Sequence, residues 1–209
     1  SQWRLLERLS SKSGRRVLRR GLVESVARHQ RAAGRGRKVF HGTLDIDAFP
    51  IEVHGDQPGA AWHGYYDQKM YQPLAAGLCA EGDFRSPRLG EGLIHGMLRR
   101  GNAGGTEGAV RFIGESLARA QDLAVHVDVR IDAGLVNGRT LDAIDDRGSR
   151  FVGRIKHNAR LEKRAAPYLK RPPGRPTRDG DEFTVELGWY QAEGWTRPYR
   201  LVLVVVDLP

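Results

Sequence analysis

The sequence predicts an α/β fold in which helices flank a mixed five-stranded sheet. Residues 39–48 and 124–132 alternate apolar and polar side chains with a period of two, as strands with one buried face do. The early strands, 39–48, 69–80 and 88–99, follow one another with short connections, which indicates antiparallel pairing. The later strands, 124–132 and 151–156, alternate with helices, which indicates parallel crossovers.

Helical spacing of apolar residues predicts the elements around this sheet. The expected helices are 2–9, 14–33, 106–121, 138–147 and 158–169. Thr106 is the expected N-cap of the third of them. The remaining segments are expected to be a loop at 51–66, a turn at 81–87 and a linker at 171–176. Two late strands are expected at 183–190 and 199–207.

Composition excludes several classes of protein. Of 209 residues, 40% are hydrophobic and 28% charged, which is typical of a globular chain rather than a disordered one. No apolar run approaches the roughly 20 residues of a membrane helix, and the basic N-terminus lacks the apolar centre of a signal peptide. The single cysteine, Cys79, excludes an internal disulfide and fits a reducing cytoplasm.

The charge of the chain is unevenly distributed. The net charge of +9 arises from +10 over residues 1–40, −6 over 41–149, +9 over 150–178 and −4 over 179–209. An acidic centre is therefore flanked by two basic stretches. This pattern predicts an acid-rich metal centre with phosphate-binding flanks, although solvated basic surfaces would give the same pattern.

Two of the expected strands end in an aspartate. Asp47 comes shortly before Pro50, and Asp132 shortly before Gly134. If these strands are parallel neighbours, the two carboxylates meet at one end of the sheet, where ligands of α/β proteins bind. Paired hard carboxylate oxygens favour Mg²⁺ or Mn²⁺, and two such ions can support phosphoryl transfer. The alternative is that each aspartate is a turn residue or helix cap.

Five blocks of sequence together resemble one known family. They are TLDIDAF (43–49), VHGDQPGAAWHGYYDQKMYQPL (53–74), LRRGNAGGTEGA (98–109), VRIDAG (129–134) and FVGRIKHNARL (151–161). In order and spacing they are similar to the DDE-type transposases of bacterial insertion sequences, which have an RNase H-like core interrupted by a β-rich insertion. The sheet order predicted above is the layout of that core.

The resemblance implies a function and a division of the chain. It implies metal-dependent DNA cleavage and strand transfer with two Mg²⁺ or Mn²⁺ ions. The enzyme would act as a homodimer on terminal inverted repeats and target DNA, in the bacterial cytoplasm at the nucleoid. It also implies a basic helical segment (1–38), an incomplete RNase H-like core (39–170) and the start of the β-rich insertion (171–209). The alternatives are an inactive DNA-binding remnant and a related RNase H-like nuclease.

The resemblance also assigns two of the three metal-binding acids. Asp47 matches the first acid and Asp132 the second. The family often has Ser or Thr shortly after the first acid, where this chain has Ala48 and Phe49, so Asp45 on the same strand face remains a competitor. No match to the final Glu occurs before Pro209, and the chain stops in an apolar strand. We therefore expect the third acid downstream, and little activity from this fragment alone.

Other side chains near these strand ends are candidates for DNA contacts. Arg130 could orient a carboxylate, touch phosphate or pair with Asp128. The remaining candidates are Arg154, Lys156 and Asn158 after the strand at 151–156, and His54 and Gln57 after the first acid. A solvated basic surface and a structural loop histidine are the alternatives. The aromatic residues Trp62, Tyr65, Tyr66 and Tyr71 could stack a flipped base, but core packing is the preferred interpretation.

Overall fold

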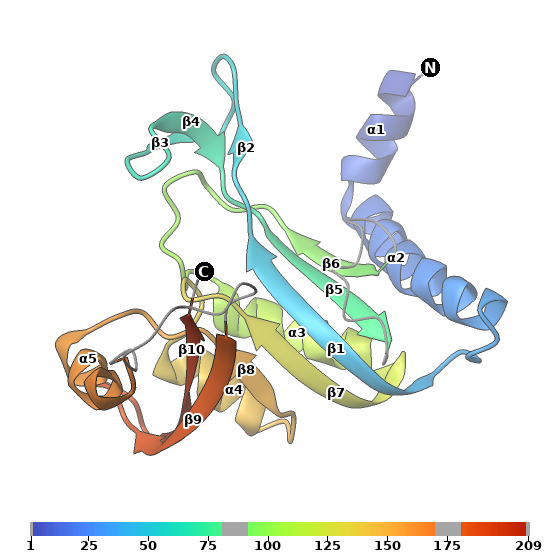
Figure 1. The fold of residues 1–209 in the computed structure, drawn as a ribbon. Coiled ribbons are helices and arrows are strands. Elements are labelled where there is room, and N and C mark those ends of the chain that lie inside the picture. Colours follow the sequence, from blue (N-terminus) through green and yellow to red (C-terminus); the bar gives the residue numbers. More distant parts are fainter. Residues whose placement is uncertain (1, 81–91, 170–180, 208–209) are drawn as a thin grey trace. The chain divides into compact units, whose positions relative to one another are not determined.

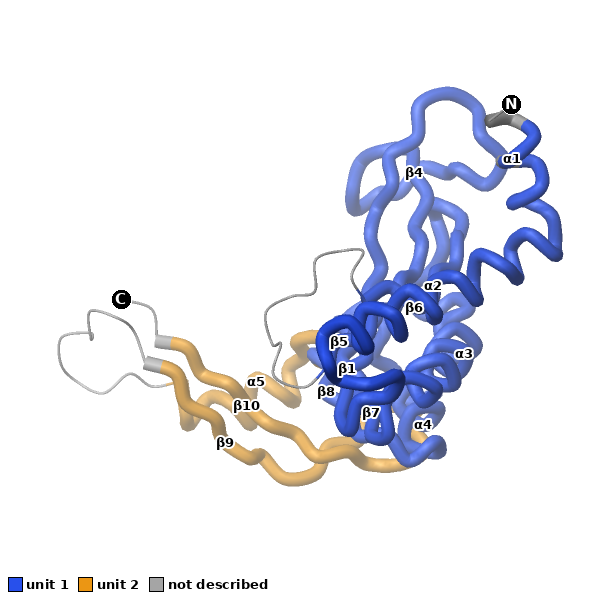
Figure 2. Tube along the Cα trace, turned by 90° about the vertical axis from the view of Figure 1, so that its right-hand side faces the viewer, with its two compact units in different colours: residues 1–154 blue, residues 155–209 orange. Residues whose placement is uncertain are grey.

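The computed structural model describes residues 2–80, 92–169 and 181–207. The chain forms two compact units, residues 1–154 and 155–209, drawn in different colours in Figure 2. The expected turn at 81–87 and linker at 171–176 lie outside the described residues, and the three-part division into 1–38, 39–170 and 171–209 stays a prediction.

A mixed five-stranded sheet forms the centre of the first unit (Figure 1). In spatial order its strands are β6 (Leu93–Met97), β5 (Leu74–Ala80), β1 (Val39–Ala48), β7 (Ala124–Ile131) and β8 (Phe151–Gly153). β1 pairs antiparallel with β5 and parallel with β7; β5–β6 is antiparallel and β7–β8 parallel. The predicted mixed sheet, with the strand order of the RNase H-like fold, is confirmed.

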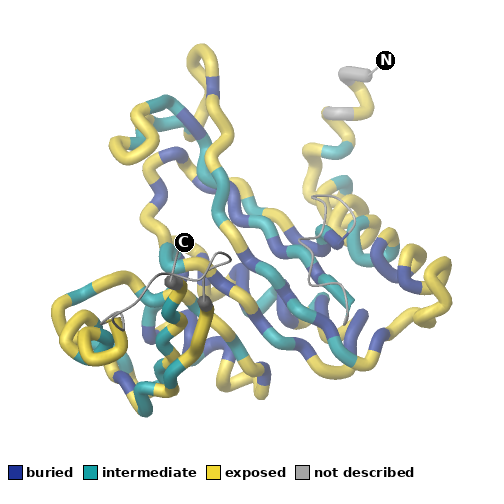
Figure 3. The backbone as a smooth tube through the Cα atoms, viewed as in Figure 1, coloured by how far each residue is buried: buried dark blue, intermediate teal, exposed yellow. Residues whose placement is uncertain are grey.

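One face of this sheet is buried and the other carries the charged residues. The burial of β1 alternates along the strand (Figure 3). Leu44 and Ile46 are buried, whereas Asp45 is half-buried and Asp47 exposed. The helices α3 (Ala109–Gln121) and α4 (Gly138–Asp145) supply the buried partners, including Phe112 of α3. Burying each such side chain contributes about 2 kcal/mol to the stability of the fold. The alternation of apolar and polar residues along β1 therefore determines which face of the sheet the aspartates occupy.

Two helices precede the sheet. Helix α1 (Gln2–Ser10) and helix α2 (Lys12–Ala32) agree closely with the expected ranges. Ser11 caps α2, because its side chain accepts a hydrogen bond from the Gly14 N–H. The buried residues of α2 include Val26 and Ala27, and this helix contacts β6.

Residues 51–71 contain a small second sheet that the sequence did not predict. Its strands, in spatial order, are β2 (Ile51–Glu52), β4 (Gln68–Tyr71) and β3 (Ala61–His63), all antiparallel. The expected loop at 51–66 and the single strand at 69–80 are therefore wrong. Pro73 explains the break, because it cannot donate a hydrogen bond to a ladder, and the chain enters a different sheet after it.

Two helix starts differ in how well the sequence predicts them. Helix α3 begins at Ala109 with Gly108 as N-cap, so the expected start at 106 with Thr106 as cap is wrong. Helix α4 has a full capping box: the Asn137 side chain accepts from the Thr140 N–H, and the Thr140 side chain from the Asn137 N–H. This box follows directly on the turn that ends β7.

The second unit consists of a short helix and a hairpin. Its elements are α5 (Ala159–Ala165), the 3-10 helix η1 (Ala166–Tyr168), β9 (Asp181–Tyr190) and β10 (Tyr199–Asp207). β9 and β10 correspond to the two expected late strands, and they pair antiparallel. Arg164 of α5 donates to the carbonyls of Leu187 and Trp189 and so holds helix and hairpin together.

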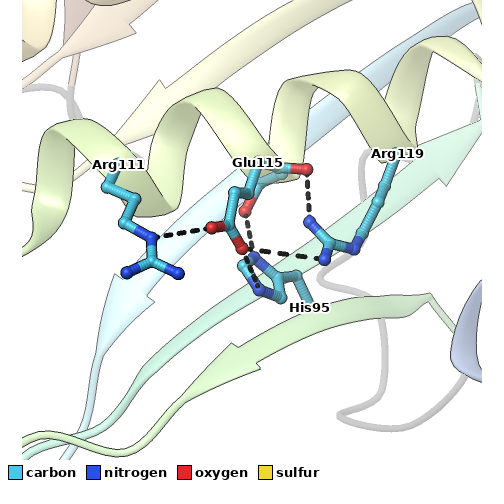
Figure 4. Close-up of polar contacts among 5 residues, drawn as sticks. His95, Arg111, Glu115 and Arg119 are labelled. Atoms are coloured by element: carbon cyan, nitrogen blue, oxygen red, sulfur yellow. Dashed lines mark hydrogen bonds and ion pairs between the residues drawn. The ribbon is translucent and has the colours of Figure 1, made fainter. Parts of the chain in front are cut away.

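A buried polar cluster joins α3 to β6 in the first unit (Figure 4). His95 is 2% exposed, stacks on Phe112, and its Nδ1 lies 3.0 Å from the Ser116 hydroxyl. Its Nε2 lies 3.3 Å from Glu115, which also binds Arg111. Burial is the main cause that lowers the pKa of His95 from 6.5 to about 4.

None of the helices among the described residues is long and apolar enough to span a membrane.

Candidate metal site at the end of strands β1 and β7

The register of β1 and β7 places Asp47 beside Asp132. The parallel ladder pairs Ile46 with Ile131, so the next residue on each strand is one of the two aspartates. Both strands end there: β1 at Ala48, before Pro50, and β7 in a turn where the Leu135 N–H donates to the Asp132 carbonyl. The expectation that these strands are parallel neighbours is confirmed, and with it the meeting of the two strand ends.

An open depression of about 470 Å³ lies at this end of the sheet. β1 contributes Asp45, Ile46 and Asp47 to its lining, β7 contributes Arg130 and Ile131, and β8 contributes Val152. Asp132, directly after β7, and Arg154, directly after β8, complete the lining. The site therefore combines three carboxylates with two guanidinium groups. Such a surface can hold cations beside the anionic oxygens of a phosphate.

Asp47 and Asp132 each accept one backbone hydrogen bond. The Ala48 N–H donates to Asp47 Oδ1 at 2.7 Å, and the Leu135 N–H to Asp132 Oδ1 at 3.2 Å. Within the described residues, Oδ2 of neither carboxylate accepts a protein hydrogen bond. Burial raises the pKa of Asp47, and the negative charges of Asp132 and Asp45 raise it further. The two carboxylates thus repel each other, as like charges at one site do.

Asp45 differs from Asp47 because it is bound by Arg130. The guanidinium donates from Nε to Asp45 Oδ1 at 2.9 Å and from Nη2 to Oδ2 at 2.6 Å. This hydrogen bonding raises the pKa of Arg130 above its usual value. The suggested pair of Arg130 with Asp128 is wrong: Asp128 instead accepts two hydrogen bonds from Arg150. Arg150 follows α4 and lies one residue before β8, so strand periodicity could not reveal this partner.

The carboxylates fit two of the ligands of a divalent metal. They are hard oxygen donors, they repel each other, and one oxygen of each is uncommitted among the described side chains. In that part of the chain, no group of three or more His, Cys, Asp or Glu side chains is arranged to hold a metal. The site is therefore a pair of acids, to which Asp45 could add only by leaving Arg130.

Comparison with known proteins identifies the family. The family model described as "Transposase DDE domain group 1" matches residues 3–207. The chain belongs to the DDE transposases. DDE transposases generally depend on divalent metal, which the paired acids fit. No curated protein matches the chain.

Among solved structures, the chain is similar to the piggyBac transposase in a cryo-EM structure of its synaptic complex with hairpin DNA. Sequence identity is 17% and the TM-score 0.41, over 85% of this chain. The match covers 35% of the piggyBac chain, so this DDE transposase chain spans about a third of the length of that protein.

The residues predicted to contact DNA lie in different environments of the transposase chain. Arg154 is exposed and lines the depression beside Asp132. His54 and Gln57 are exposed in the loop between β2 and β3. In the second unit Lys156 is exposed, whereas Asn158 caps α5 by accepting hydrogen bonds from the N–H groups of Arg160 and Leu161. The helix cap gives Asn158 a structural role; DNA contact by any of these residues stays a prediction.

The aromatic residues of the small sheet are not core residues of the transposase. Trp62 is 61% exposed, Tyr65 85% and Tyr66 39%, so core packing is wrong for these three. Tyr71 is half-buried, and its hydroxyl donates to the Pro58 carbonyl. The signal for this sheet was two short runs, AWH and QKMY, on either side of a turn in which Asp67 has a positive φ of 52°.

Sequence reasoning also missed Arg99, which is 6% exposed in the loop between β6 and α3. Its guanidinium donates to the carbonyls of four other residues: Gln72, Gly104, Gly105 and Glu107. Arg99 lies in the run RRGNAGG (99–105), whose glycines are typical of a loop. Nothing in its pattern distinguishes the buried Arg99 from the exposed Arg100 beside it.

Proposed function

We propose that this chain carries the first two acids of a transposase that cuts DNA at the ends of a bacterial insertion sequence and joins the freed ends to target DNA. Asp47 is the first metal-binding acid and Asp132 the second. The observation that carries the proposal is their alignment on neighbouring parallel strands, at the strand ends and beside one depression. Family membership supplies the reaction class.

Two Mg²⁺ or Mn²⁺ ions would activate the attacking oxygen and stabilise the leaving oxygen of the phosphodiester. Asp47 and Asp132 would hold them through the carboxylate oxygens that face the depression. In the first step water attacks the phosphodiester and frees a 3′-hydroxyl; in the second that hydroxyl attacks target DNA, whose own 3′-oxygen leaves. Arg154 lies where it can bind a phosphate oxygen, while Arg130 keeps Asp45 occupied.

The proposed substrate is the terminal inverted repeats of the element and the target DNA, bound by a homodimer. The basic helices α2 and α5 would contact the phosphate backbone, with +10 over residues 1–40 and +9 over 150–178. Binding of this kind weakens steeply with salt, because it releases condensed counterions. DNA as substrate would place the protein in the cytoplasm, at the nucleoid.

The deciding experiment replaces the second acid by its neutral isostere. In the intact protein, Asp132→Asn should reduce Mg²⁺-dependent cleavage of an end-containing duplex by about a thousandfold, or about 4 kcal/mol of transition-state stabilisation. The Kd for the same duplex, measured by fluorescence anisotropy, should change less than about threefold, since the basic helices are untouched.

Asp128→Asn is the matched control. Asp128 lies on the same strand and the same face of β7, but it binds Arg150 and does not line the depression. We expect its variant to cut DNA at close to the wild-type rate. Undiminished cleavage by Asp132→Asn would refute the assignment, and equal losses in both variants would show that the effect is not specific to Asp132.

A further inference from the structure

Arg99 organises the loop between β6 and α3. Its Nε donates to the Gln72 carbonyl at 2.8 Å, and its Nη1 lies within 3.0–3.2 Å of the carbonyls of Gly104, Gly105 and Glu107. A buried guanidinium that binds backbone oxygens in several directions fixes the path of a loop that has no ladder of its own. The segment 99–107, here called the Arg99 loop, is therefore held in one conformation.

The Arg99 loop touches the turn that follows Asp132. A Cβ added at Gly105 would lie 2.5 Å from the Gly134 carbonyl oxygen, so the two backbones meet without room for a methyl group. A Cβ at Gly134 would in turn lie 3.2 Å from Asp132 Oδ2. Gly105, Gly134 and the Asp132 carboxylate thus form a continuous packed contact, in which a shift of the loop moves the turn.

The other end of the Arg99 loop is also fixed. A Cβ at Gly101 would collide with the carbonyl oxygens of Met70 and Ala61, in strands β4 and β3 of the small sheet. The Gly101 N–H also donates to the Gly59 carbonyl. The loop is thus wedged between the small sheet and the turn after β7, so it cannot yield by sliding away from Gly134.

The charge of the buried Arg99 side chain interacts with that of the second acid. Burial lowers the pKa of Arg99, whereas the charges of Glu107 and Asp132 raise it. Its Nη2 is buried and has no hydrogen-bond partner among the described residues. The negative charges of Glu107 and Asp132 therefore compensate the positive charge of Arg99 in part.

We propose that Arg99 is a positioning residue, which locks the Arg99 loop against Gly134 and thereby aims the Asp132 carboxylate into the depression. This inference rests on the proposed function, because it assigns a purpose to Asp132. Outer contacts of this kind, when removed, cost about tenfold to hundredfold in metal affinity or activity. The small sheet would stabilise the same turn from a distance, through the loop.

Two neighbouring glycines allow a test with a single methyl group. Gly105→Ala places a Cβ against Gly134, whereas a Cβ at Gly104 meets nothing within 4 Å, and neither glycine has a positive φ. In the intact protein, Gly105→Ala should raise the Mg²⁺ concentration for half-maximal cleavage by about tenfold or more. Gly104→Ala should leave this concentration within about twofold of wild type, and both variants should keep the wild-type Kd for DNA.

A second readout does not depend on activity. Fe²⁺ bound in place of Mg²⁺, with ascorbate and peroxide, cleaves the protein backbone near its ligands. Gly105→Ala should reduce backbone cleavage next to residue 132 relative to cleavage next to residue 47, whereas Gly104→Ala should keep the wild-type ratio. A role of the loop in stability alone would lower the melting temperature without moving this ratio or the Mg²⁺ concentration.

Arg99→Lys keeps the charge but cannot reach carbonyls in several directions, so it should shift the Mg²⁺ concentration as Gly105→Ala does. Wild-type metal dependence in both Arg99→Lys and Gly105→Ala would overturn the inference. Asp132→Asn, measured in parallel, separates the two proposals. If it is inactive while Arg99→Lys and Gly105→Ala both keep the wild-type metal dependence, only the positioning role is wrong; if it cleaves normally, the proposed function is wrong.

Discussion

Replacing His95 by glutamine should flatten the dependence of stability on pH. His95 is almost fully buried, and its pKa of about 4 lies below the 6.5 of an unfolded chain. Between these values the unfolded chain takes up a proton that the folded protein does not, so acid favours unfolding. At 1.36 kcal/mol per pH unit, His95 costs about 2 kcal/mol of stability by pH 5 and about 3 kcal/mol by pH 4.

The assay is urea denaturation at pH 7, 6 and 5, for wild type and His95→Gln. Over this range Glu115, whose pKa is lowered by Arg111, stays ionised in the folded protein, and with its ordinary pKa of 4.5 it stays mostly ionised in the unfolded chain. The free energy of unfolding of wild type should fall by about 2 kcal/mol more than that of the variant between pH 7 and 5. His54→Gln, at a histidine side chain that is 87% exposed, should follow wild type. Equal pH slopes for wild type and His95→Gln would refute the reasoning.

Two further predictions concern the acids and the turn after β7. Asp45→Asn should reduce cleavage by less than about tenfold, because it removes only a half-exposed ion pair with Arg130. Asp47→Asn should reduce cleavage by about a thousandfold. The reverse order of the two losses in a single-turnover cleavage assay would make Asp45 the first acid. Asn137→Ala should lower the free energy of unfolding by about 1 kcal/mol through loss of the α4 cap, with Asn102→Ala, at an exposed loop residue, as the control in urea denaturation.

The central sheet was predictable because its strands obey the period-two rule. Leu44 and Ile46 alternate with Asp45 and Asp47, and burial of the apolar pair fixes the face of the acids. Helical connections between the later strands indicate parallel pairing. The sequence left open whether the strands of Asp47 and Asp132 are neighbours; the structure pairs them in parallel, and because parallel strands end at the same edge, their ends meet.

The partners of charged side chains were not predictable in this way. Arg130 could reach Asp128 on its own strand or Asp45 on the neighbouring one, and only the register decides between them. The ladder places Asp45 opposite Arg130, and Arg150, just before β8, takes Asp128. The burial of Arg99 is also a tertiary property, since it depends on loops that converge from distant parts of the chain.

The two aspartates of β1 share a face, so their different roles must come from their partners. Asp45 would have to break two charge-assisted hydrogen bonds with Arg130 before it could bind a metal, and it would leave that guanidinium unpaired. Asp47 has no such cost: one of its oxygens accepts only from the Ala48 N–H, and its repulsion from Asp132 is relieved when a cation arrives. Arg130 therefore favours Asp47 as the first acid by occupying its competitor. Arg130→Gln would free Asp45 to bind metal as well. The variant should therefore still cleave DNA, but over a broader range of metal concentrations than wild type.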